Sequence, residues 1–591
     1  MILVFMYRKN FIAILALLAC SILSITAHAQ GFLKARDTII VDANGQKFIL
    51  RGMGLGGWML QEGYMFRVSN LGQQYRIKEK IAEVVGPEKT KLFYDQWLSH
   101  HTTQTDIDSL AAWGFNSIRL PMHYNLLTLP VDEEPVAGNN TWLEKGFALT
   151  DSLLKWCARN KMYLILDLHA TPGGQGNDLP ISDRDPAKAS LWQSEANQEK
   201  MIALWRKLAE HYANAPFIGG YDIINEPNWG FEDPKDVRGT KEQLNAPLKK
   251  LMVSITKAIR EVDPNHIIII EGNGFGNNYN GLLPTWDNNM VLSFHKYGNF
   301  NNDASIARFL QLREKYNVPL WMGESGENSN TWFTEAIRLV ERHDIGWAWW
   351  QSKKMGINNP LEVKMPDGYH ALLDYWSGKG PKPSEAEAWN TLQELLANIQ
   401  ISHNVYHPDV TDAMFRQVRS SGTTPFKQHV AGNETVLVNA VDYDMGRQGS
   451  AYYDRDTAAY QYTPGVNSTG NRGRAYRNDG VDIQPGKEGY YVYSIEDGEW
   501  LQYTVNVTQT GNYTLAFNTA SDSTGGRFSF LDGNTVLIKE QPVPDSKGMQ
   551  NWQAIEIKNI HLNKGVHQFR VYADKGGFNF LSIRFTQQGN K

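Results

Sequence analysis

The chain has 591 residues, of which 42% are hydrophobic and 20% are charged, and its formal net charge is −5. A chain of this length can bury more than one hydrophobic core. The small acidic excess argues against nucleic acid or anionic lipid as a partner and is compatible with a neutral substrate.

The first 29 residues have the pattern of an export signal. Arg8-Lys9 precede an apolar segment, residues 11–25, and Ala27-His28-Ala29 has the small-residue spacing that a signal peptidase recognises. The segment is too short for a stable membrane span. We therefore expect a secreted protein, extracellular or periplasmic. A lipobox-like run ending at Cys20 leaves an outer-membrane lipoprotein as the alternative.

From residue 48 onward, short apolar runs alternate with amphipathic segments, which is typical of repeated βαβ units. Eight parallel strands in this length predict an α/β fold with a closed (β/α)8 TIM barrel. An open doubly wound sheet is the alternative, but no glycine-rich phosphate loop follows an early strand. The eight runs are residues 48–51, 116–120, 163–168, 220–224, 267–270, 291–294, 320–323 and 346–350.

Two of these runs end at a glutamate. Asn225-Glu226-Pro227 follows the fourth run, and Gly323-Glu324 ends the seventh. The carboxyl ends of barrel strands form the catalytic face of this fold. Two carboxyl groups on opposite sides of a glycosidic bond can protonate the leaving oxygen and attack the anomeric carbon or activate water. The pair therefore predicts a glycosidase.

Further polar and aromatic residues lie at the other strand ends. Each one alone is more often a hydrogen-bonded structural group. Their convergence at one end of a barrel is hard to explain by packing, which favours apolar residues. The set comprises Arg119, His169, Asn225, His295, Tyr297, Trp349 and Trp350.

Together these motifs resemble glycoside hydrolase family 5, whose members are retaining β-glycanases, over roughly residues 40–400. The resemblance implies Glu226 as acid/base and Glu324 as nucleophile, with no cofactor and no metal. It also implies substrate-binding or supporting roles for Arg119, His169, Asn225, His295, Tyr297 and Trp350. The matching pieces are 118–121, 167–169, 224–227, 293–297, 323–324 and 349–350.

The chemistry of the two glutamates gives three expectations. Glu226 must begin protonated, and the charge of Glu324 is expected to raise its pKa. Arg119 and Tyr297 are expected to donate hydrogen bonds to Glu324 and keep it ionised. A retaining enzyme places its two carboxyl groups about 5 to 5.5 Å apart.

Aromatic residues near the strand ends are candidate sugar platforms. Trp350 is expected to stack on the sugar at the cleaved bond. Trp58, Trp229 and Trp332 are candidates for other subsites, with ordinary packing as an equal alternative.

The sequence defines the substrate less sharply than the reaction. Residues 51–58 and 169–175 look similar to the branch that contains exo-acting β-1,3-glucanases, whereas endo-β-1,4-glucanase is the family's commonest activity. We expect a β-glucan hydrolase, endo-β-1,4-glucanase or cellulase-like. The alternatives are an exo-β-1,3-glucanase and a non-catalytic polysaccharide-binding protein. The polar loop 177–190 is expected to wall off one end of the cleft.

The pattern changes after the barrel, which is predicted over residues 30–400. Residues 401–432 are predicted to form a linker. In residues 433–588, short alternating runs such as 500–507 and 513–517 are separated by turns. This pattern predicts an all-β sandwich.

The sandwich resembles a family 6 carbohydrate-binding module with a jelly-roll fold, through residues 451–454, 476–483, 498–503 and 576–579. The resemblance implies a sugar site with two aromatic residues and an asparagine, for which Trp552, Tyr493 and Asn579 are the matches. Relatives carry a structural calcium, but Val441 and Leu581 replace expected carboxylates, so we expect that site to be absent. We expect a monomer whose partner is a polysaccharide, held by the module near the barrel.

Overall fold

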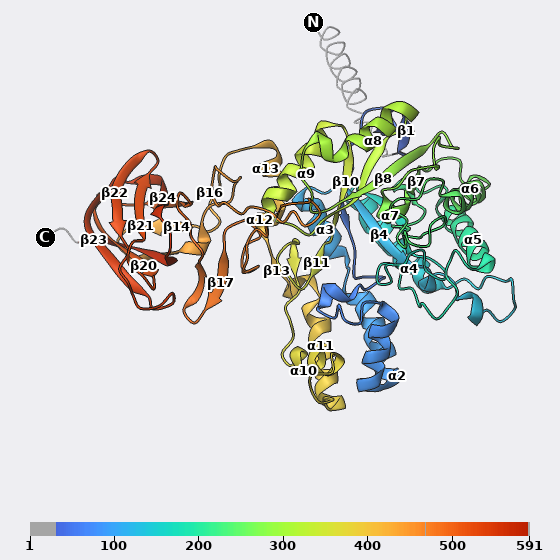
Figure 1. Ribbon diagram of the computed structural model, residues 1–591, viewed down its shortest axis with the longest axis horizontal. Helices are drawn as coiled ribbons and strands as arrows, with labels where there is room; N and C mark the ends of the chain where they lie inside the picture. Colours follow the sequence, from blue (N-terminus) through green and yellow to red (C-terminus); the bar gives the residue numbers. More distant parts are fainter. Residues whose placement is uncertain (1–30, 467, 589–591) are drawn as a thin grey trace, which may run out of the picture.

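The computed structural model describes residues 31–466 and 468–588. It consists of a large α/β lobe and a smaller β lobe that contains the C-terminal part of the chain (Figure 1). The predicted export signal and Cys20 lie outside the described residues. Within the described ranges, no helix is both long and apolar enough to cross a membrane.

The large lobe is a closed barrel of eight parallel strands, which confirms the predicted (β/α)8 fold. The barrel closes where β10 pairs with β3. Every residue of β4, β5, β8 and β9 is buried, as expected for parallel strands that are covered on both faces. The strands are β3 (Arg51–Gly54), β4 (Ser117–His123), β5 (Tyr163–Ala170), β6 (Ile218–Asp222), β7 (Ile268–Glu271), β8 (Met290–Lys296), β9 (Leu320–Gly326) and β10 (Gly346–Trp350).

Helices surround the barrel and begin at local sequence signals. Ser194 caps α5 by accepting a hydrogen bond from Asn197 N, and Met201, Leu204 and Trp205 on the inner face are buried. The helices are α2 (Gln74–His100), α3 (Gln104–Trp113), α4 (Glu144–Arg159), α5 (Glu195–Tyr212), α6 (Ala246–Arg260), α7 (Asn273–Gly276), α8 (Asp303–Tyr316) and α9 (Asn330–Arg342).

Two later helices, α10 (Tyr369–Trp376) and α11 (Glu385–Asn398), extend the barrel lobe. They share an apolar cluster with α2 and project beside it in Figure 1. A hairpin of β1 (Lys34–Arg36) and β2 (Ile39–Val41) lies near the chain start, and Leu33 and Ile40 there join a cluster that fills the barrel interior with Tyr163 and Trp321.

Residues 401–432, predicted as a linker, contain secondary structure that packs on the barrel lobe. The helices α12 (Pro408–Met414) and α13 (Arg416–Arg419) lie against α9. β13 (Val405–Tyr406) pairs with β12 (Leu361–Glu362), which pairs with β11 (Lys353–Lys354). Thr334 Oγ1 donates to Ala413 O at 2.8 Å. Residues 401–419 are therefore fastened to the barrel, whereas β14 at the end of the segment pairs with a strand of the smaller lobe.

The smaller lobe is a sandwich of two six-stranded sheets, with Phe517, Phe530 and Phe569 buried between them. Val441 and Leu581 are also buried. One sheet contains β14 (His429–Ala431), β16 (Tyr452–Tyr453), β19 (Trp500–Val507), β21 (Arg527–Asp532), β22 (Thr535–Pro542) and β24 (Gly565–Lys575). The other contains β15 (Val436–Asn439), β17 (Ile483–Gly486), β18 (Gly489–Val492), β20 (Gly511–Ala520), β23 (Gln553–Leu562) and β25 (Asn579–Gln587).

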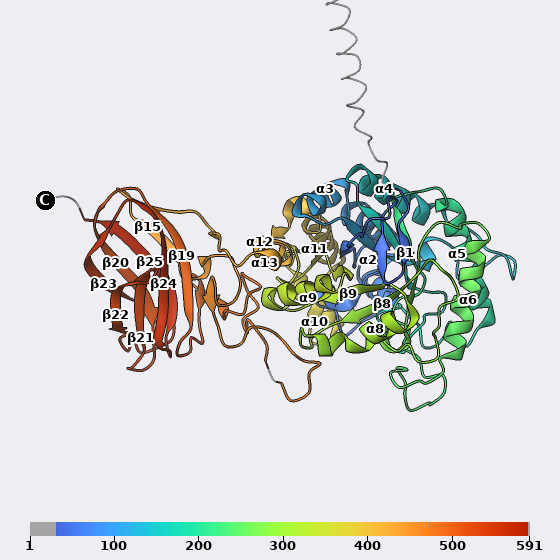
Figure 2. The same cartoon turned by 90° about the horizontal axis from the view of Figure 1, so that it is seen from above.

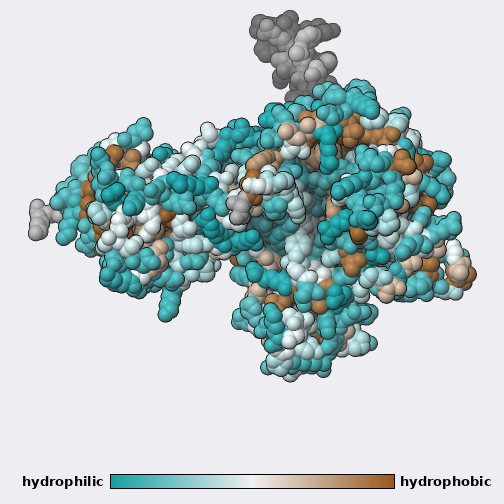
Figure 3. All heavy atoms as spheres, in the orientation of Figure 1, coloured by the Kyte–Doolittle hydropathy of each residue, from teal (hydrophilic) through white to brown (hydrophobic). Residues whose placement is uncertain are grey.

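The two lobes are in direct contact next to α9, α12 and α13, where Figures 1 and 2 both place the module. Asn330 Nδ2 donates to Asp409 Oδ2 at 2.7 Å and to Asp479 Oδ1 at 3.1 Å. Asn478 N donates to the same oxygen of Asp409 at 2.9 Å. Barrel, connecting segment and module thus share one buried hydrogen-bond network. The surface seen in Figure 3 is largely hydrophilic on both lobes.

Candidate active site

The two predicted catalytic glutamates lie at the carboxyl end of the barrel. Glu226 follows β6, and Glu324 lies in β9. Both are largely buried, at 8% and 6% exposure. Glu226 has a φ of 40°, in the left-handed region that a non-glycine residue rarely occupies. Its N–H donates to Glu271 Oε2 at 2.7 Å, a contact that holds this turn in place.

Glu324 accepts hydrogen bonds at both of its oxygens. Arg119 Nη1 donates to Oε2 at 2.8 Å, and Tyr297 OH donates to Oε1 at 2.7 Å. Both expected donors are therefore present. A carboxylate with two such donors is held in a fixed orientation.

Arg119 is buried at the centre of a charged network. Its Nη2 donates to Asn225 Oδ1 at 2.7 Å and to Asp222 Oδ2 at 2.9 Å, and Nη2 lies 3.3 Å from Glu271 Oε1. Burial alone would lower the pKa of Arg119, but the surrounding carboxylates outweigh it and raise the pKa. The guanidinium therefore stays charged inside the barrel and neutralises several acids.

His295 links the acid/base to a third glutamate. Its Nδ1 lies 2.7 Å from Glu226 Oε1, and its Nε2 lies 3.0 Å from Glu271 Oε1. Burial would lower the pKa of His295, but Glu271, Glu324 and Glu226 raise it well above its ordinary value. A protonated His295 donates to both carboxyl groups that it touches.

The pKa of Glu226 is raised, as expected for a general acid. Burial is the main cause; His295 opposes it, and the charges of Glu324 and Glu271 add to it. Glu271 behaves in the opposite way. Burial would raise its pKa, but His295 and Arg119 outweigh that effect and lower it. The shifts therefore favour the protonated form of Glu226 and the ionised form of Glu271.

Trp350, His169 and Asn225 form one side of the site. The rings of Trp350 and His169 are stacked, with centroids 5.2 Å apart and 3° between the planes. His169 Nδ1 lies 2.8 Å from Asp167 Oδ2, and its Nε2 lies 3.2 Å from Asn225 Nδ2. The aspartate fixes the proton on Nδ1, so that Nε2 accepts from the Asn225 amide.

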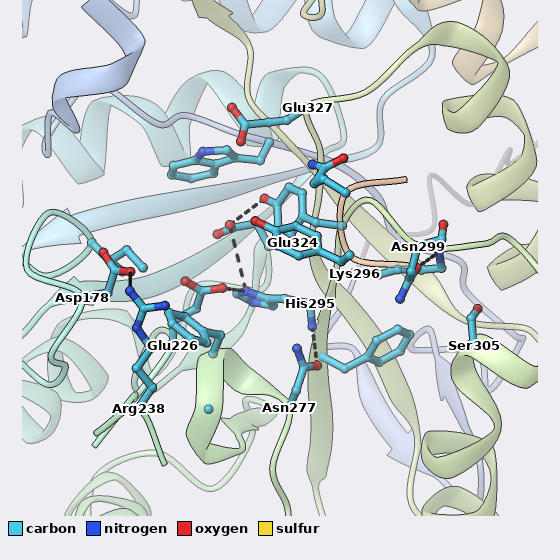
Figure 4. Close-up of a pocket in the computed structure, with 18 of the residues that line it drawn as sticks. Asp178, Glu226, Arg238, Asn277, His295, Lys296, Asn299, Ser305, Glu324 and Glu327 are labelled. Carbon is cyan, nitrogen blue, oxygen red and sulfur yellow. Dashed lines mark hydrogen bonds and ion pairs between the residues drawn. The ribbon is translucent and has the colours of Figure 1, made fainter. Parts of the chain in front are cut away.

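A cleft of about 480 Å³ lies over these groups (Figure 4). Figure 4 shows Glu226 and Glu324 on either side of His295, with Arg238 and Asp178 at the rim near Glu226. Residues that the sequence analysis did not select also line the cleft, and they include Glu62, Tyr64, Asp178, Arg238, Phe275, Glu327, Gln461 and Tyr462.

Glu62 is a buried carboxyl group in the cleft. Its Oε1 lies 4.0 Å from His169 Nε2. Burial raises its pKa well above the ordinary value, and the charges of Glu324, Glu327 and Glu226 add to the effect. Glu62 lies in the loop after β3, where neither periodicity nor a strand end marks it. Tyr64, two residues on, accepts a hydrogen bond from Trp350 Nε1 at 2.7 Å.

Hydrogen bonds join the loop 177–190 to the start of α2 and to the end of β4. Gln73 Nε2 donates to Arg184 O at 3.3 Å, and Tyr75 N donates to Asp183 Oδ1 at 2.9 Å. Asp183 also pairs with His123 at 3.0 Å. The loop 177–190 therefore meets the loop after β3 and contributes Asp178 and Ile181 to the cleft wall.

Of the proposed aromatic platforms, Trp350 lines the cleft, whereas Trp58, Trp229 and Trp332 do not. Trp58 and Trp332 are buried, with Nε1 donating to Leu98 O and to Asn299 O, respectively. The packing alternative is correct for both, because an indole with a satisfied N–H suits a buried position. Trp229 is half-buried, and the Arg184 guanidinium lies 4.9 Å from its ring centroid.

Glu226, His295 and Glu324 are the one set of three metal-ligand side chains that lie together among the described residues, with ligand atoms within 4.8 Å of one another. A protonated His295 offers no lone pair to a cation, and Tyr297 and Arg119 occupy the oxygens of Glu324. These residues suit proton transfer and nucleophilic attack better than metal binding.

The predicted sugar site of the module contains an aromatic cluster. The rings of Tyr491 and Trp552 are 5.1 Å apart, and those of Tyr491 and Tyr493 are 6.5 Å apart. Trp552 and Tyr493 therefore flank one buried tyrosine. Asn579 is 2% exposed, and its Nδ2 donates to Met549 O at 2.6 Å. The amide nitrogen of Asn579 is thus occupied inside the module, whereas its buried Oδ1 has no hydrogen-bond partner among the described residues.

Comparisons with known proteins agree with this architecture. Residues 78–356 match the cellulase family, glycosyl hydrolase family 5, and residues 474–587 match the carbohydrate-binding module family 6. The chain is therefore a glycoside hydrolase. It combines a family 5 catalytic barrel with a C-terminal family 6 module, as the sequence motifs predicted.

Curated relatives share the barrel region. A β-xylosidase from Phanerodontia chrysosporium is 29% identical over 381 residues, which are 58% of this chain and 75% of that protein. Endoglucanase C from Acetivibrio thermocellus is 24% identical over 338 residues, 47% of this chain and 91% of that protein. Among solved structures, the C-terminal module of a Zobellia galactanivorans laminarinase covers 26% of this chain and 100% of its own, with 28% identity and a TM-score of 0.19.

Proposed function

We propose that this protein is a retaining β-glucan hydrolase in which Glu226 is the acid/base and Glu324 the nucleophile. One observation carries the proposal: a carboxyl oxygen of Glu226 and one of Glu324 lie within 4.8 Å of each other. Retaining glycosidases place these groups about 5 to 5.5 Å apart, whereas inverting enzymes need about 6.5 to 9.5 Å to admit a water.

In the first step, Glu226 gives its proton to the glycosidic oxygen while Glu324 attacks the anomeric carbon. The bond to the leaving sugar breaks, and a glycosyl ester forms on Glu324. His295 donates to Glu226 Oε1, which leaves Oε2 to carry the transferred proton. The hydrogen bonds from Arg119 and Tyr297 aim the attacking carboxylate.

In the second step, water attacks the anomeric carbon and Glu226 takes its proton. Esterification removes the negative charge of Glu324, which raised the pKa of Glu226 in the free enzyme. The pKa of Glu226 therefore falls, and the group changes from acid to base. Release of the sugar restores the Glu324 carboxylate.

The relatives support β-glucan as the substrate. Two kinds of them are named for it, endoglucanase C and probable glucan 1,3-β-glucosidase A. We place the loop 177–190, which is tied to Gln73 and Tyr75 by hydrogen bonds, across one end of the cleft. A closed end favours release of short products from a chain end, which is the exo-acting alternative. Xylan is the second candidate because one relative is named a β-xylosidase.

We further propose that the protein is exported, extracellular or periplasmic, and acts as a monomer. The module would hold the barrel on the polysaccharide and raise the local substrate concentration. The non-catalytic alternative is disfavoured, because both glutamates keep a complete set of supporting contacts.

Product release tests the proposal. Full-length protein is incubated with β-1,4-glucan, laminarin-type β-1,3-glucan and xylan, with Glu324→Gln as the inactive comparison and Glu314→Gln as a matched surface control. We expect one glucan to be hydrolysed with retention of anomeric configuration, as followed by NMR. Monosaccharide or disaccharide products from the start of the reaction would indicate exo action. Binding without product from any polymer would favour the non-catalytic alternative.

A further inference from the structure

A segment of the module, residues 455–462, lies on the barrel beside the nucleophile strand. Ala458 is fully buried in the apolar cluster of the barrel lobe. Asn328 Nδ2 donates to Ala459 O at 2.6 Å, and Ala459 N donates to Asn328 Oδ1 at 3.0 Å. Ser329 Oγ donates to Thr457 O at 2.5 Å. Asn328 and Ser329 follow β9, the strand that contains Glu324.

The same segment also contacts the loop after β8. The rings of Tyr460 and Phe300 are 4.9 Å apart, and Tyr462 N donates to Gly298 O at 2.9 Å. Gly298 has a φ of 47°, and a Cβ built there would lie 2.6 Å from Gln461 Cδ. The left-handed φ favours glycine here, and the Gln461 side chain packs directly over Gly298, in the loop that follows Tyr297.

Two side chains of this segment reach the catalytic cleft. Gln461 and Tyr462 line it together with Glu226 and Glu324. In Figure 4 a pale orange ribbon of the module passes near Lys296 and Asn299. Tyr462 is 67% exposed, so its ring is available for contact.

The side of the cleft follows from the roles of the surrounding groups. Trp350, His169 and Glu62 line the cleft, and His169 lies in β5. The transferred sugar would be held beside the stacked rings of Trp350 and His169, and the proton of Glu226 must point toward the oxygen of the leaving group. The segment that carries Tyr462 enters from the loops after β8 and β9, which lie across the closed barrel from β4 and β5. Tyr462 therefore lies on the side of the cleft opposite His169, where the leaving group would be.

We propose that Tyr462 and Gln461 form the leaving-group subsite, so that the module completes the substrate site of the barrel. The inference rests on the proposed function. The ligand is a neutral β-linked glucose unit on the reducing-end side of the cleaved bond. The Tyr462 ring offers a face for the pyranose. The Gln461 amide makes no hydrogen bond to the other described residues and can pair with sugar hydroxyls.

This position predicts an effect on only one of the two chemical steps. The leaving sugar occupies its subsite while the glycosyl ester forms, and it has departed before water attacks. With a 2,4-dinitrophenyl β-glucoside, loss of the activated leaving group is fast and hydrolysis of the ester limits kcat. A residue of the leaving-group subsite then has no influence on kcat.

The experiment compares Tyr462→Ala with Tyr490→Ala in the full chain. Tyr490 is also an exposed tyrosine of the module, but it packs on Tyr476 away from the cleft. The substrates are laminaritriose, cellotriose and 2,4-dinitrophenyl β-glucoside. For Tyr462→Ala we expect kcat/KM on the hydrolysed trisaccharide to fall about tenfold. We expect kcat on the dinitrophenyl glucoside to stay within about twofold of wild type. Tyr490→Ala should match wild type on both.

Three outcomes overturn the inference. Equal kcat/KM on the trisaccharide for Tyr462→Ala and Tyr490→Ala would show that the ring does not contact the leaving sugar. An equal fall in kcat on the trisaccharide and on the dinitrophenyl glucoside would show that Tyr462 stabilises the barrel and does not bind the leaving sugar. A wild-type chain that hydrolyses none of the three compounds would overturn the subsite, and one that also leaves polymeric β-glucan intact would refute the proposed function itself.

Discussion

The catalytic cleft and the predicted sugar site of the module are built from different kinds of side chains. The cleft holds charged groups in nearly complete burial, with Arg119 and Glu271 at 1% and 0% exposure. The module site is formed by neutral rings, Tyr493 and Trp552 beside Tyr491. Breaking a glycosidic bond requires carboxyl groups with shifted proton affinities, and burial with opposing charges produces such shifts. Holding a sugar requires only exposed aromatic surface.

The largest expected effect comes from the acid/base. Glu226→Gln should lower kcat on polymeric substrate by about 10²- to 10⁴-fold, since no proton reaches the leaving oxygen. Formation of the ester from 2,4-dinitrophenyl β-glucoside should persist, because that leaving group needs no proton. Burst kinetics with this compound would measure the difference. Equal loss of ester formation on both substrates would contradict the role of Glu226.

Replacement of the buried Arg119 guanidinium should lower the stability of the barrel as well as its activity. Arg119→Met leaves Asp222, Glu271 and Glu324 without their shared counter-charge, and we expect about 3 to 5 kcal/mol less free energy of unfolding for the barrel. Urea unfolding followed by tryptophan fluorescence measures it. The surface control is Arg206→Met, whose pair with Glu261 is exposed and should contribute less than about 1 kcal/mol. A similar loss for both variants would refute the importance of burial.

The pH profile should depend on His295. The general acid must be protonated, so kcat/KM falls as pH rises through the pKa of Glu226, which burial places above its ordinary value. His295 opposes that shift, because its positive charge and hydrogen bond stabilise the carboxylate. Replacement by glutamine should therefore raise the pKa of Glu226 and move the alkaline limb to higher pH. A limb that moves to lower pH would contradict this arrangement.

The smallest effect is expected in the module. Trp552→Ala should weaken binding to insoluble β-glucan by about fivefold to tenfold, the loss typical of one aromatic contact. Hydrolysis of the dinitrophenyl glucoside should be unchanged, since that small substrate needs only the barrel. Pull-down on insoluble glucan gives the binding measurement, with Tyr490→Ala as the aromatic control. Unchanged binding would show that the sugar site lies elsewhere on the module.

The sequence analysis located the strand-end residues of the barrel because parallel strands bring their carboxyl ends to one rim. The same rule could have found Glu271, which directly follows the apolar run 267–270. The first strand was placed at 48–51, whereas β3 spans Arg51–Gly54. Its glycines explain the error. A Cβ on Gly52 would lie 2.9 Å from Ser117 Oγ, so this strand contains glycine where the prediction relied on apolar side chains.

Other parts of the site depend on contacts between distant segments. Glu62 and Asp178 lie in loops whose positions are set by pairs such as Tyr75 with Asp183. Tyr462 reaches the cleft only because its segment docks on Asn328. Neither periodicity nor a local motif encodes such contacts. Conversely, Trp58 and Trp332 neighbour catalytic motifs in the sequence, but both are buried.

The network around Asn330 has a consequence for engineering by domain exchange. Asn330 of the barrel, Asp409 of the connecting segment and Asn478 of the module satisfy one another's polar atoms. A barrel cut at residue 400 would expose the face of α9 that α12 covers and leave the Asn330 amide without these partners. Residues 401–419 therefore belong with the barrel, whereas β14, β15 and β16 are strands of the module sheets. A chimera with another module should keep α12 and α13 and supply an equivalent of Asn478.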